Sequence, residues 1–220
     1  MARPKLLDLF CGAGGASVGY FDAGFDVVGV DINPQPNYPF DFVQADALEY
    51  VKEHRHEFDV IHASPPCQAS TTLTSGTNKG RVYPQLIPAT RELLKSTGLP
   101  YVIENVQGSD VRRDLTLCGE TFGLGVLRHR YFEVSGFDVV QPEHKPHRGR
   151  VTGWNHGKYH DGPYFAVYGE GGGKGTVAQW QQAMGIDWTS DRKELAEAIP
   201  PAYTEHIGLQ LIRQIVTVSV

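Results

Sequence analysis

The sequence predicts an α/β domain built on a parallel sheet, with a small insertion late in the chain. Short apolar stretches near residues 5–10, 25–30, 58–61 and 101–106 alternate with helix-like stretches. Several of these strands end in glycine, acidic or cysteine residues, and open α/β sheets bind ligands at the carboxyl ends of their strands. A chain of 220 residues, 40% of them hydrophobic, is long enough for one such core.

The composition is that of an ordinary globular protein. The first residues, MARPKLLDLF, lack the apolar region of a signal peptide, and no apolar run is long enough to span a membrane. Three cysteines, Cys11, Cys67 and Cys118, form an odd set without metal-like spacing, which favours reduced thiols in a cytoplasm. The net charge of −5 argues against a general nucleic-acid coat but allows a local basic cleft.

The first strand, residues 5–10, runs into the glycine turn CGAGGAS, and a helix then extends to Ala23 and stops at Gly24. The second strand ends at Asp31, 19 positions after Gly12, where a carboxylate can hold a ribose hydroxyl pair. A third strand near residues 42–43 precedes Asp46. Together these features predict a nucleoside pocket, although both acids could instead cap helices. Ser17 replaces the last glycine of the dinucleotide pattern, which disfavours a nicotinamide cofactor.

The stretch HASPPCQAS, residues 62–70, places Cys67 after a buried strand predicted near residues 58–61. Pro65 and Pro66 fix an extended turn and exclude a helix there. The polar residues 69–80 that follow resemble a loop that can close over a ligand. Cys67 is therefore a candidate nucleophile, and the alternative is a small buried core cysteine.

A helix is predicted over residues 84–96, followed by a buried strand, YVIENV, that carries Glu104 near its end. A buried carboxyl group tends to become protonated and can then donate a proton, unless the backbone or a cation holds it as a carboxylate. Further on, Arg128 and Arg130 alternate along a segment predicted to be extended, so both should point to one side. They suit phosphate or base recognition, or they protect an exposed edge strand.

Residues 141–175 differ from the rest, with five Lys or Arg residues against three acids and with interleaved aromatic residues. This pattern is typical of a nucleic-acid contact surface. The spacing of His144, His147, His156 and His160 is compatible with zinc, but no cysteine lies among them and we expect no metal site. The chain then returns to a helix ending at Gly185 and a final helix after Pro200 and Pro201.

The segments DLFCGAGG, SPPCQ, ENV and RHR, with the two acids between the first and second, resemble the DNA cytosine-5 methyltransferase family in order and spacing. The resemblance covers residues 6 to about 134 and resumes from about 176 with AMGIDW and EAIPP. It implies the S-adenosylmethionine-dependent methyltransferase sandwich, a Rossmann-like α/β fold. Residues 1–134 and 176–220 would form the catalytic domain, and residues 135–175 a small target-recognition region.

The resemblance also implies roles for individual residues. Cys67 would be the nucleophile, Glu104 its acidic partner on the cytosine ring, and Arg130 and Arg128 would complete the catalytic set. Gln68 and Asn105 would bind the substrate. The residues that would bind S-adenosylmethionine are Phe10, Gly12, Ala13, Gly14, Asp31, Ile32, Asp46, Ala47 and Pro66.

In such an enzyme a thiolate adds to C6 of cytosine while an acid acts at N3, which makes C5 nucleophilic. A stacked base is out of reach, so base flipping from double-stranded DNA is implied. The chain departs from the family pattern at Ser64, Val126 and Glu197, where glycine, glutamine and asparagine are usual. Its short recognition region is similar to that of phage-encoded members. We therefore expect a monomer in the cytoplasm of a bacterial or phage-infected cell, with no membrane partner and a role such as restriction-modification.

Three other interpretations remain open at this stage. The cysteine chemistry could act on a free cytosine nucleotide, or with a modified sulfonium donor. The chain could also be a catalytically silent DNA-binding relative, although the presence of Cys67, Glu104 and Arg130 argues against this. An NAD-linked oxidoreductase is disfavoured, since no second nucleotide-binding half is visible.

Overall fold

A computed structural model of the chain describes residues 2–66, 86–155, 157–168 and 175–218. The helices are α1 (Gly15–Ala23), α2 (Ala47–His54), α3 (Leu86–Thr97), α4 (Val177–Met184), α5 (Arg192–Glu197) and α6 (Pro201–Val218), with the 3₁₀ turns η1 (Arg55–Glu57) and η2 (Gly119–Phe122). The strands of the main sheet are β1 (Lys5–Leu9), β2 (Asp26–Asp31), β3 (Asp41–Gln44), β4 (Val60–Ala63), β5 (Tyr101–Asn105), β6 (Leu115–Leu117) and β7 (Arg130–Ser135). Strands β8 (Gly153–Asn155) and β9 (Lys158–His160) form a separate hairpin.

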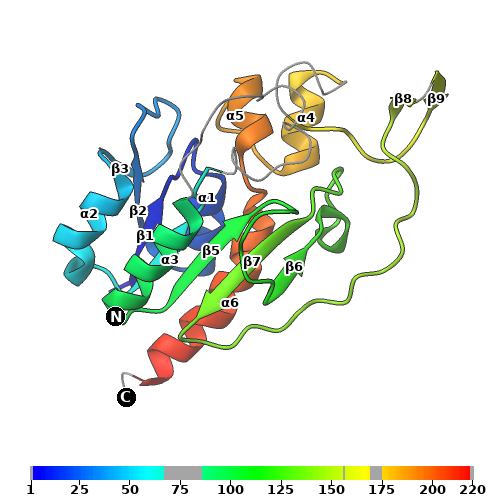
Figure 1. Cartoon of the computed structure of the whole chain (residues 1–220). Coiled ribbons are helices and arrows are strands. Elements are labelled where there is room, and N and C mark those ends of the chain that lie inside the picture. The colour runs from blue at the N-terminus through cyan, green and yellow to red at the C-terminus, as the bar shows by residue number, and fades with distance from the viewer. Residues whose placement is uncertain (1, 67–85, 156, 169–174, 219–220) are drawn as a thin grey trace.

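The main sheet has the order β3-β2-β1-β4-β5-β7-β6 (Figure 1). Strands β1 to β5 pair in parallel, whereas β7 runs antiparallel to both β5 and β6. The strand order reverses between β1 and β4, and such a switch point is where open α/β sheets bind their ligands. The predicted Rossmann-like α/β class is thus confirmed.

Alternation along the strands divides the core into two layers. Leu6 and Val102 pack with Tyr20 of α1 and Ile207 of α6 on one face. On the other face, residues such as Leu7 pack under α2 and α3. A third apolar cluster joins α4 and α5 to the turn that precedes β7.

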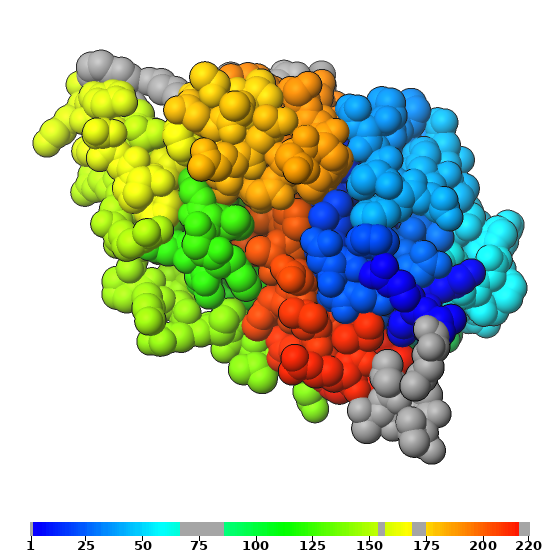
Figure 2. All heavy atoms as spheres, turned by 180° about the vertical axis from the view of Figure 1, so that it is seen from behind, coloured from blue at the N-terminus to red at the C-terminus, as the bar shows by residue number. Residues whose placement is uncertain are grey.

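Helix α1 contacts α6 through glycine, because any larger residue would collide with the neighbouring backbone. A Cβ atom on Gly19 would lie 2.0 Å from the Pro201 carbonyl oxygen, and one on Gly15 would lie 2.3 Å from that of Ile199. Thr204 Oγ1 of α6 also donates to the Ala16 carbonyl at 2.8 Å. Figure 2 shows α6 lying between the N-terminal elements and the region around β6. The C-terminal helix α6 therefore packs closely against α1, the helix that follows the glycine turn.

Most predicted elements are present, with shifted ends. Gly24 and Gly185 end α1 and α4 with positive φ angles of 110° and 69°, as expected. The strand predicted near residues 58–61 is instead Val60–Ala63, and Pro201 begins α6 rather than only interrupting the chain. Sequence reasoning missed α2 and α5, whose N-caps are Asp46 and Asp191.

The predicted recognition region leaves the sheet after β7. Figure 1 shows the chain running outside β6 and then reaching the β8–β9 hairpin, which projects from the rest of the protein. Val151 and Tyr164 form a bridge at the base of this hairpin. No helix among the described residues is long and apolar enough to cross a lipid bilayer.

Asp8, on β1, is a fully buried acid beneath the glycine turn. Ser17 donates a hydrogen bond to its Oδ2, while Oδ1 has no hydrogen-bond partner among the described residues. Burial, with smaller contributions from Asp31 and Glu104, raises its pKa from 3.8 to about 7. Since the folded-state pKa is raised, Asp8 favours folding below about pH 4, and this contribution is lost as the pH rises through 7.

We therefore expect Asp8→Asn to flatten the pH dependence of stability. The wild type should lose up to about 4 kcal/mol more than the variant between pH 4 and pH 8, because one pKa unit corresponds to about 1.4 kcal/mol. Urea unfolding at several pH values measures this difference. Parallel pH profiles for the two proteins would contradict it.

Candidate functional site

The glycine turn after β1 is held in a conformation that most residues avoid. Phe10, Gly12 and Gly14 have φ angles of 57°, 49° and 87°. A positive φ on a phenylalanine is costly and persists only where the surroundings enforce it. A Cβ on Gly14 would lie 2.9 Å from Pro39, whereas one on Gly12 would meet nothing within 4 Å. The backbone at Gly12 therefore faces open space that a ligand can approach.

Asp31, at the end of β2, is fixed beside this turn. Its Oδ2 accepts a hydrogen bond from the Gly12 amide at 3.2 Å, and its Oδ1 accepts one from the Asn33 amide at 2.9 Å. The neighbouring Ile32 exposes 65% of its surface, which is unusual for a large apolar side chain next to a buried sheet. An oriented carboxylate and an exposed apolar side chain thus lie together at the strand end.

Asp46 has the structural role that the helix-cap alternative predicted. Its Oδ1 accepts hydrogen bonds from the amides of Leu48 and Glu49 at 2.9 and 3.1 Å, at the N-terminus of α2. Both of these bonds use the same oxygen, so the cap leaves Oδ2 for another donor. Ala47 is buried in the first turn of the helix.

Glu104 and Arg130 form a buried ion pair at the next part of the same edge. Arg130 Nε lies 3.0 Å from Glu104 Oε1, and Glu104 is 5% exposed. Burial raises the pKa of the Glu104 carboxyl above its usual range, and the two nearby arginines, Arg130 and Arg128, oppose this effect. The direction is that required of a carboxyl group that donates a proton.

Asn105 connects this strand to the turn that leads to the candidate nucleophile. Its Nδ2 donates a 2.8 Å hydrogen bond to the carbonyl of Pro65, and the side chain is buried. The Ser64 amide donates to the Leu9 carbonyl at 3.1 Å, which fixes the end of β4 beside β1. Pro66 is exposed. Cys67, Gln68 and the predicted closing loop lie outside the described residues.

Ser64, where the family pattern has glycine, extends a buried polar chain to this site. The Ser64 Oγ lies 3.0 Å from His62 Nε2, and the Tyr20 hydroxyl lies 3.0 Å from His62 Nδ1. Burial lowers the pKa of His62 to about 3, so the ring is neutral at physiological pH. A hydrogen bond from Ser64 also lowers the pKa of Glu104. Sequence reasoning did not identify His62, whose place on a buried strand was its only signal.

The expectation that Arg128 and Arg130 alternate along one extended segment is wrong, although both guanidinium groups lie near Glu104. Strand β7 begins at Arg130, and Arg128 has a φ angle of 38°. The Arg128 guanidinium donates to the carbonyls of Val167, Ala196 and Ala198 at 2.6, 2.6 and 2.7 Å. It therefore fastens the α5 region to the turn before β7. The physical reason is that three carbonyls lie within reach of the N–H donors of one planar guanidinium.

Ala13 and Trp188 join residues 1–134 to residues 176–220, the two segments that the sequence predicts to form one domain. The Trp188 indole Nε1 donates to the Ala13 carbonyl at 2.8 Å, and Ala13 is buried. Glu197, where asparagine is usual, has its pKa raised mainly by burial, with Asp31 among the contributing charges. The AMGIDW and EAIPP segments thus lie close to the glycine turn and Asp31.

The histidine-rich region also differs from the prediction. Cys118, distant in sequence, lies 3.5 Å from His147, so the expectation that no cysteine accompanies the histidines is wrong. His129 and His144 belong to the same cluster, whereas His160 does not. His156 lies outside the described residues. Sequence reasoning missed the antiparallel pairing of β6 with β7, and this pairing places Cys118 beside His129.

Comparison with known proteins gives one family. Residues 4–113, half of the chain, match the family model described as C-5 cytosine-specific DNA methylase. The Type II methyltransferase M.XorII of Xanthomonas oryzae is 28% identical over 159 residues, 64% of this chain and 35% of that protein. M.AgeI of Thalassovita gelatinovora is 28% identical over 169 residues, 67% of this chain and 38% of that protein. The chain therefore spans less than half the length of these curated relatives.

Solved structures share the fold over nearly the whole chain. A candidate DNA modification methyltransferase encoded within a prophage (E. coli) has a TM-score of 0.64 at 15% identity, covering 97% of this chain and 99% of that one. The Entamoeba histolytica methyltransferase EhMeth has a TM-score of 0.64 at 12% identity, covering 98% and 99%. S. pombe Dnmt2 has a TM-score of 0.57 at 14% identity, covering 99% and 100%. Likeness at such identities concerns the fold.

The contacts of Arg128 and Arg130 predict different consequences for the same substitution. Arg128→Lys should lower the free energy of unfolding by about 2 kcal/mol or more. The three carbonyls accept from two different nitrogens of the guanidinium, and the single nitrogen of a lysine ammonium cannot reach all of them. Arg130→Lys should cost less, because an ammonium can still pair with Glu104. Urea unfolding of both variants tests this order. Equal losses, or a larger loss for Arg130→Lys, would contradict the assignment of Arg128 as a fastening residue.

Proposed function

Because the chain belongs to the C-5 cytosine-specific DNA methylase family, we propose that it transfers a methyl group from S-adenosylmethionine to C5 of cytosine in double-stranded DNA. The observation that carries the proposal is the buried pair of Glu104 and Arg130, next to an Asn105 side chain that holds Pro65. This contact joins the ENV and PPC motifs physically. It sets the acid beside Pro65, which precedes Cys67 by two positions in the sequence.

The residues at the strand ends fit S-adenosylmethionine. Open space beside Gly12 admits a ligand to the backbone, and Asp31 presents an oriented carboxylate there for a ribose hydroxyl pair. Ile32 offers an exposed apolar surface for a base ring, and Asp46 retains one carboxylate oxygen for an amino group. When bound, S-adenosylmethionine supplies an electrophilic methyl group on a sulfonium sulfur.

The chain's own residues then act on cytosine. The Cys67 thiolate forms a bond to C6, and Glu104, protonated, donates to N3, so that electron density moves to C5. Arg130 holds Glu104 and orients the base. After methyl transfer a base removes the C5 proton, the bond between Cys67 and C6 breaks as N3 returns its proton to the Glu104 carboxylate, and the thiolate and the protonated acid are both regenerated. Arg128, committed to three carbonyls, positions this region instead of contacting the base.

Features of the insertion support a DNA substrate. Lys145, Arg148, Arg150 and Lys158 are all exposed, and Tyr159 exposes 52% of its surface beside them in sequence. Cations and rings of this kind suit phosphates and unstacked bases. A stacked cytosine must leave the helix to reach a buried pair such as Glu104 and Arg130. We further propose that the protein acts as a monomer, in the bacterial or phage-infected cytoplasm where its DNA lies.

Nucleoside mass spectrometry tests the proposal. Incubation of duplex DNA with the protein and S-adenosylmethionine should yield 5-methylcytosine, with no product from Cys67→Ala. Glu104→Gln should slow the reaction by roughly 10² to 10⁴-fold, because an amide cannot deliver the proton. Free dCMP is incubated in parallel. Product from dCMP alone would place the protein in nucleotide metabolism, and product from Cys67→Ala would contradict the covalent route.

Ser64 gives a prediction for the pH profile. Its hydroxyl lowers the pKa of Glu104, so Ser64→Gly should raise that pKa further. If protonated Glu104 is the active form, activity declines as the pH rises through its pKa, and the alkaline limb of the variant should move to higher pH. Rates from pH 6 to 10 measure this shift, with Ser109→Gly as a control outside the site. A limb that stays in place or moves to lower pH would contradict the role given to Glu104.

A further inference from the structure

Four side chains from three separate parts of the chain converge at the outer edge of the sheet. Cys118 follows β6 and His129 precedes β7, and the pairing of Leu117 with Arg130 makes them neighbours across the ladder. His144 and His147 come from the chain that runs outside β6. Their ligand atoms, one sulfur and three ring nitrogens, all lie within 4.8 Å of one another. We call these residues the Cys118 cluster.

Three of the six separations between these ligand atoms are close to those of a tetrahedral zinc site. Bonds of about 2.0 to 2.1 Å to nitrogen and about 2.3 Å to sulfur place two nitrogens about 3.3 Å apart, and sulfur and nitrogen about 3.5 Å apart. The observed distances are 3.5 Å from Cys118 Sγ to His147 Nε2 and 3.3 Å from His147 Nε2 to His144 Nε2. The His144 Nε2 and His129 Nε2 atoms lie 3.0 Å apart.

Hydrogen bonds between the rings do not account for this convergence. Each neutral imidazole has one N–H donor and one nitrogen lone pair. His144 Nε2 faces the Nε2 atoms of both His129 and His147. If His144 Nε2 carries a proton, it can donate that proton to only one of the two. If it carries none, it can accept from both only when His129 Nε2 and His147 Nε2 are each protonated. In that second case His147 Nε2 has no lone pair left for Cys118. Three lone pairs and a thiolate directed at one cation satisfy all four groups at once.

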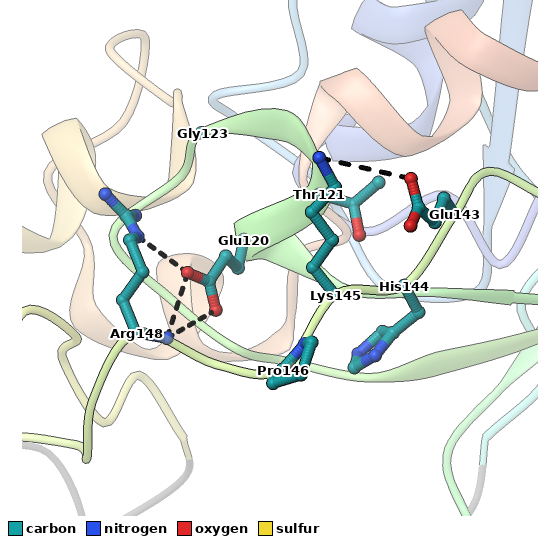
Figure 3. Close-up of a pocket in the computed structure, with 8 residues that line it drawn as sticks. All are labelled: Glu120, Thr121, Gly123, Glu143, His144, Lys145, Pro146 and Arg148. Carbon is teal, nitrogen blue, oxygen red and sulfur yellow. Dashed lines mark hydrogen bonds and ion pairs between the residues drawn. The ribbon is translucent and has the colours of Figure 1, made fainter.

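The surroundings hold the histidine segment against the cysteine strand. Glu120, in the turn η2 that follows Cys118, accepts hydrogen bonds from Arg148 Nε at 2.6 Å and from the Arg148 amide at 3.2 Å. Figure 3 shows these two side chains pointing toward one another, with His144 and Pro146 on the adjoining stretch of the same segment. The His147 ring also packs edge-on against Tyr164 at 6.4 Å. The ligands are thus held in place from both sides.

We propose that Cys118, His129, His144 and His147 bind one structural Zn²⁺ ion. Four protein ligands complete a tetrahedral shell and leave no position for a substrate, which is the mark of a structural site. One thiolate with three imidazoles suits zinc better than the oxygen-preferring Mg²⁺ or Ca²⁺. The ion would fasten the predicted recognition region to His129, the residue between Arg128 and Arg130. A metal at the edge of the sheet therefore sets the position of the insertion relative to the Glu104–Arg130 pair.

Metal analysis of the purified full chain, without a histidine tag, tests the site directly. Inductively coupled plasma mass spectrometry should find about one zinc per chain in the wild type and in His160→Ala, a control histidine in the same region. Cys118→Ser and His147→Ala should each lose most of it. Less than a tenth of an equivalent in the folded wild type, even after exposure to Zn²⁺ and desalting, would overturn the proposal. Full zinc retention in Cys118→Ser or in His147→Ala would do the same.

Cobalt spectroscopy decides the case even if the variants fail to fold. Wild-type protein that has been stripped with a chelator and loaded with Co²⁺ should show intense visible bands of tetrahedral cobalt and a thiolate charge-transfer band in the near ultraviolet. Added Zn²⁺ should abolish both and raise the melting temperature of the stripped protein. Weak octahedral bands without charge transfer would show that Cys118 is not a ligand and would overturn the assignment.

Discussion

Parallel pairing of β1 with β2 and β4 brings the ends of these strands to one edge of the sheet, and the whole candidate site depends on this constraint. The pairing sets the turn at Gly12 beside Asp31, and it sets the end of β4 at Ser64 beside Leu9. Strand β5 extends the edge and adds Glu104. Residues far apart in the sequence thus reach one place because backbone hydrogen bonds fix the register, and side chains only refine it.

Two arginines separated by one residue illustrate how the chain divides its tasks. The Arg128 guanidinium donates hydrogen bonds to the carbonyls of Val167 and of the α5 region. These bonds hold the C-terminal part of the domain over the strand ends. Arg130 faces Glu104. His129 between them belongs to the Cys118 cluster. Three consecutive side chains therefore contact three different parts of the protein: the α5 region, Glu104 on β5, and the histidine segment of the insertion.

The sequence was informative where local chemistry decides structure. Glycine ends α1 and α4 as expected, and short continuous apolar stretches mark the buried strands β1, β4 and β5, because turn geometry and burial act over a few residues. It was uninformative where distant segments meet. The three carbonyls around Arg128 and the approach of Cys118 to His147 come from tertiary packing, which no local pattern encodes. The short helix α2 was missed because Asp46 was taken first as a ligand and only second as a cap.

The central claim is that Cys67 forms a covalent bond to cytosine while the Glu104–Arg130 pair acts on the ring. Duplex DNA with 5-fluorocytosine in the target site tests it most directly, because fluorine at C5 cannot leave as a proton and the adduct persists. With S-adenosylmethionine present, mass spectrometry under denaturing conditions should find the protein bonded to the DNA strand at Cys67, and Cys67→Ser should give no such species. Methylation of ordinary duplex DNA without any trapped adduct would contradict the account.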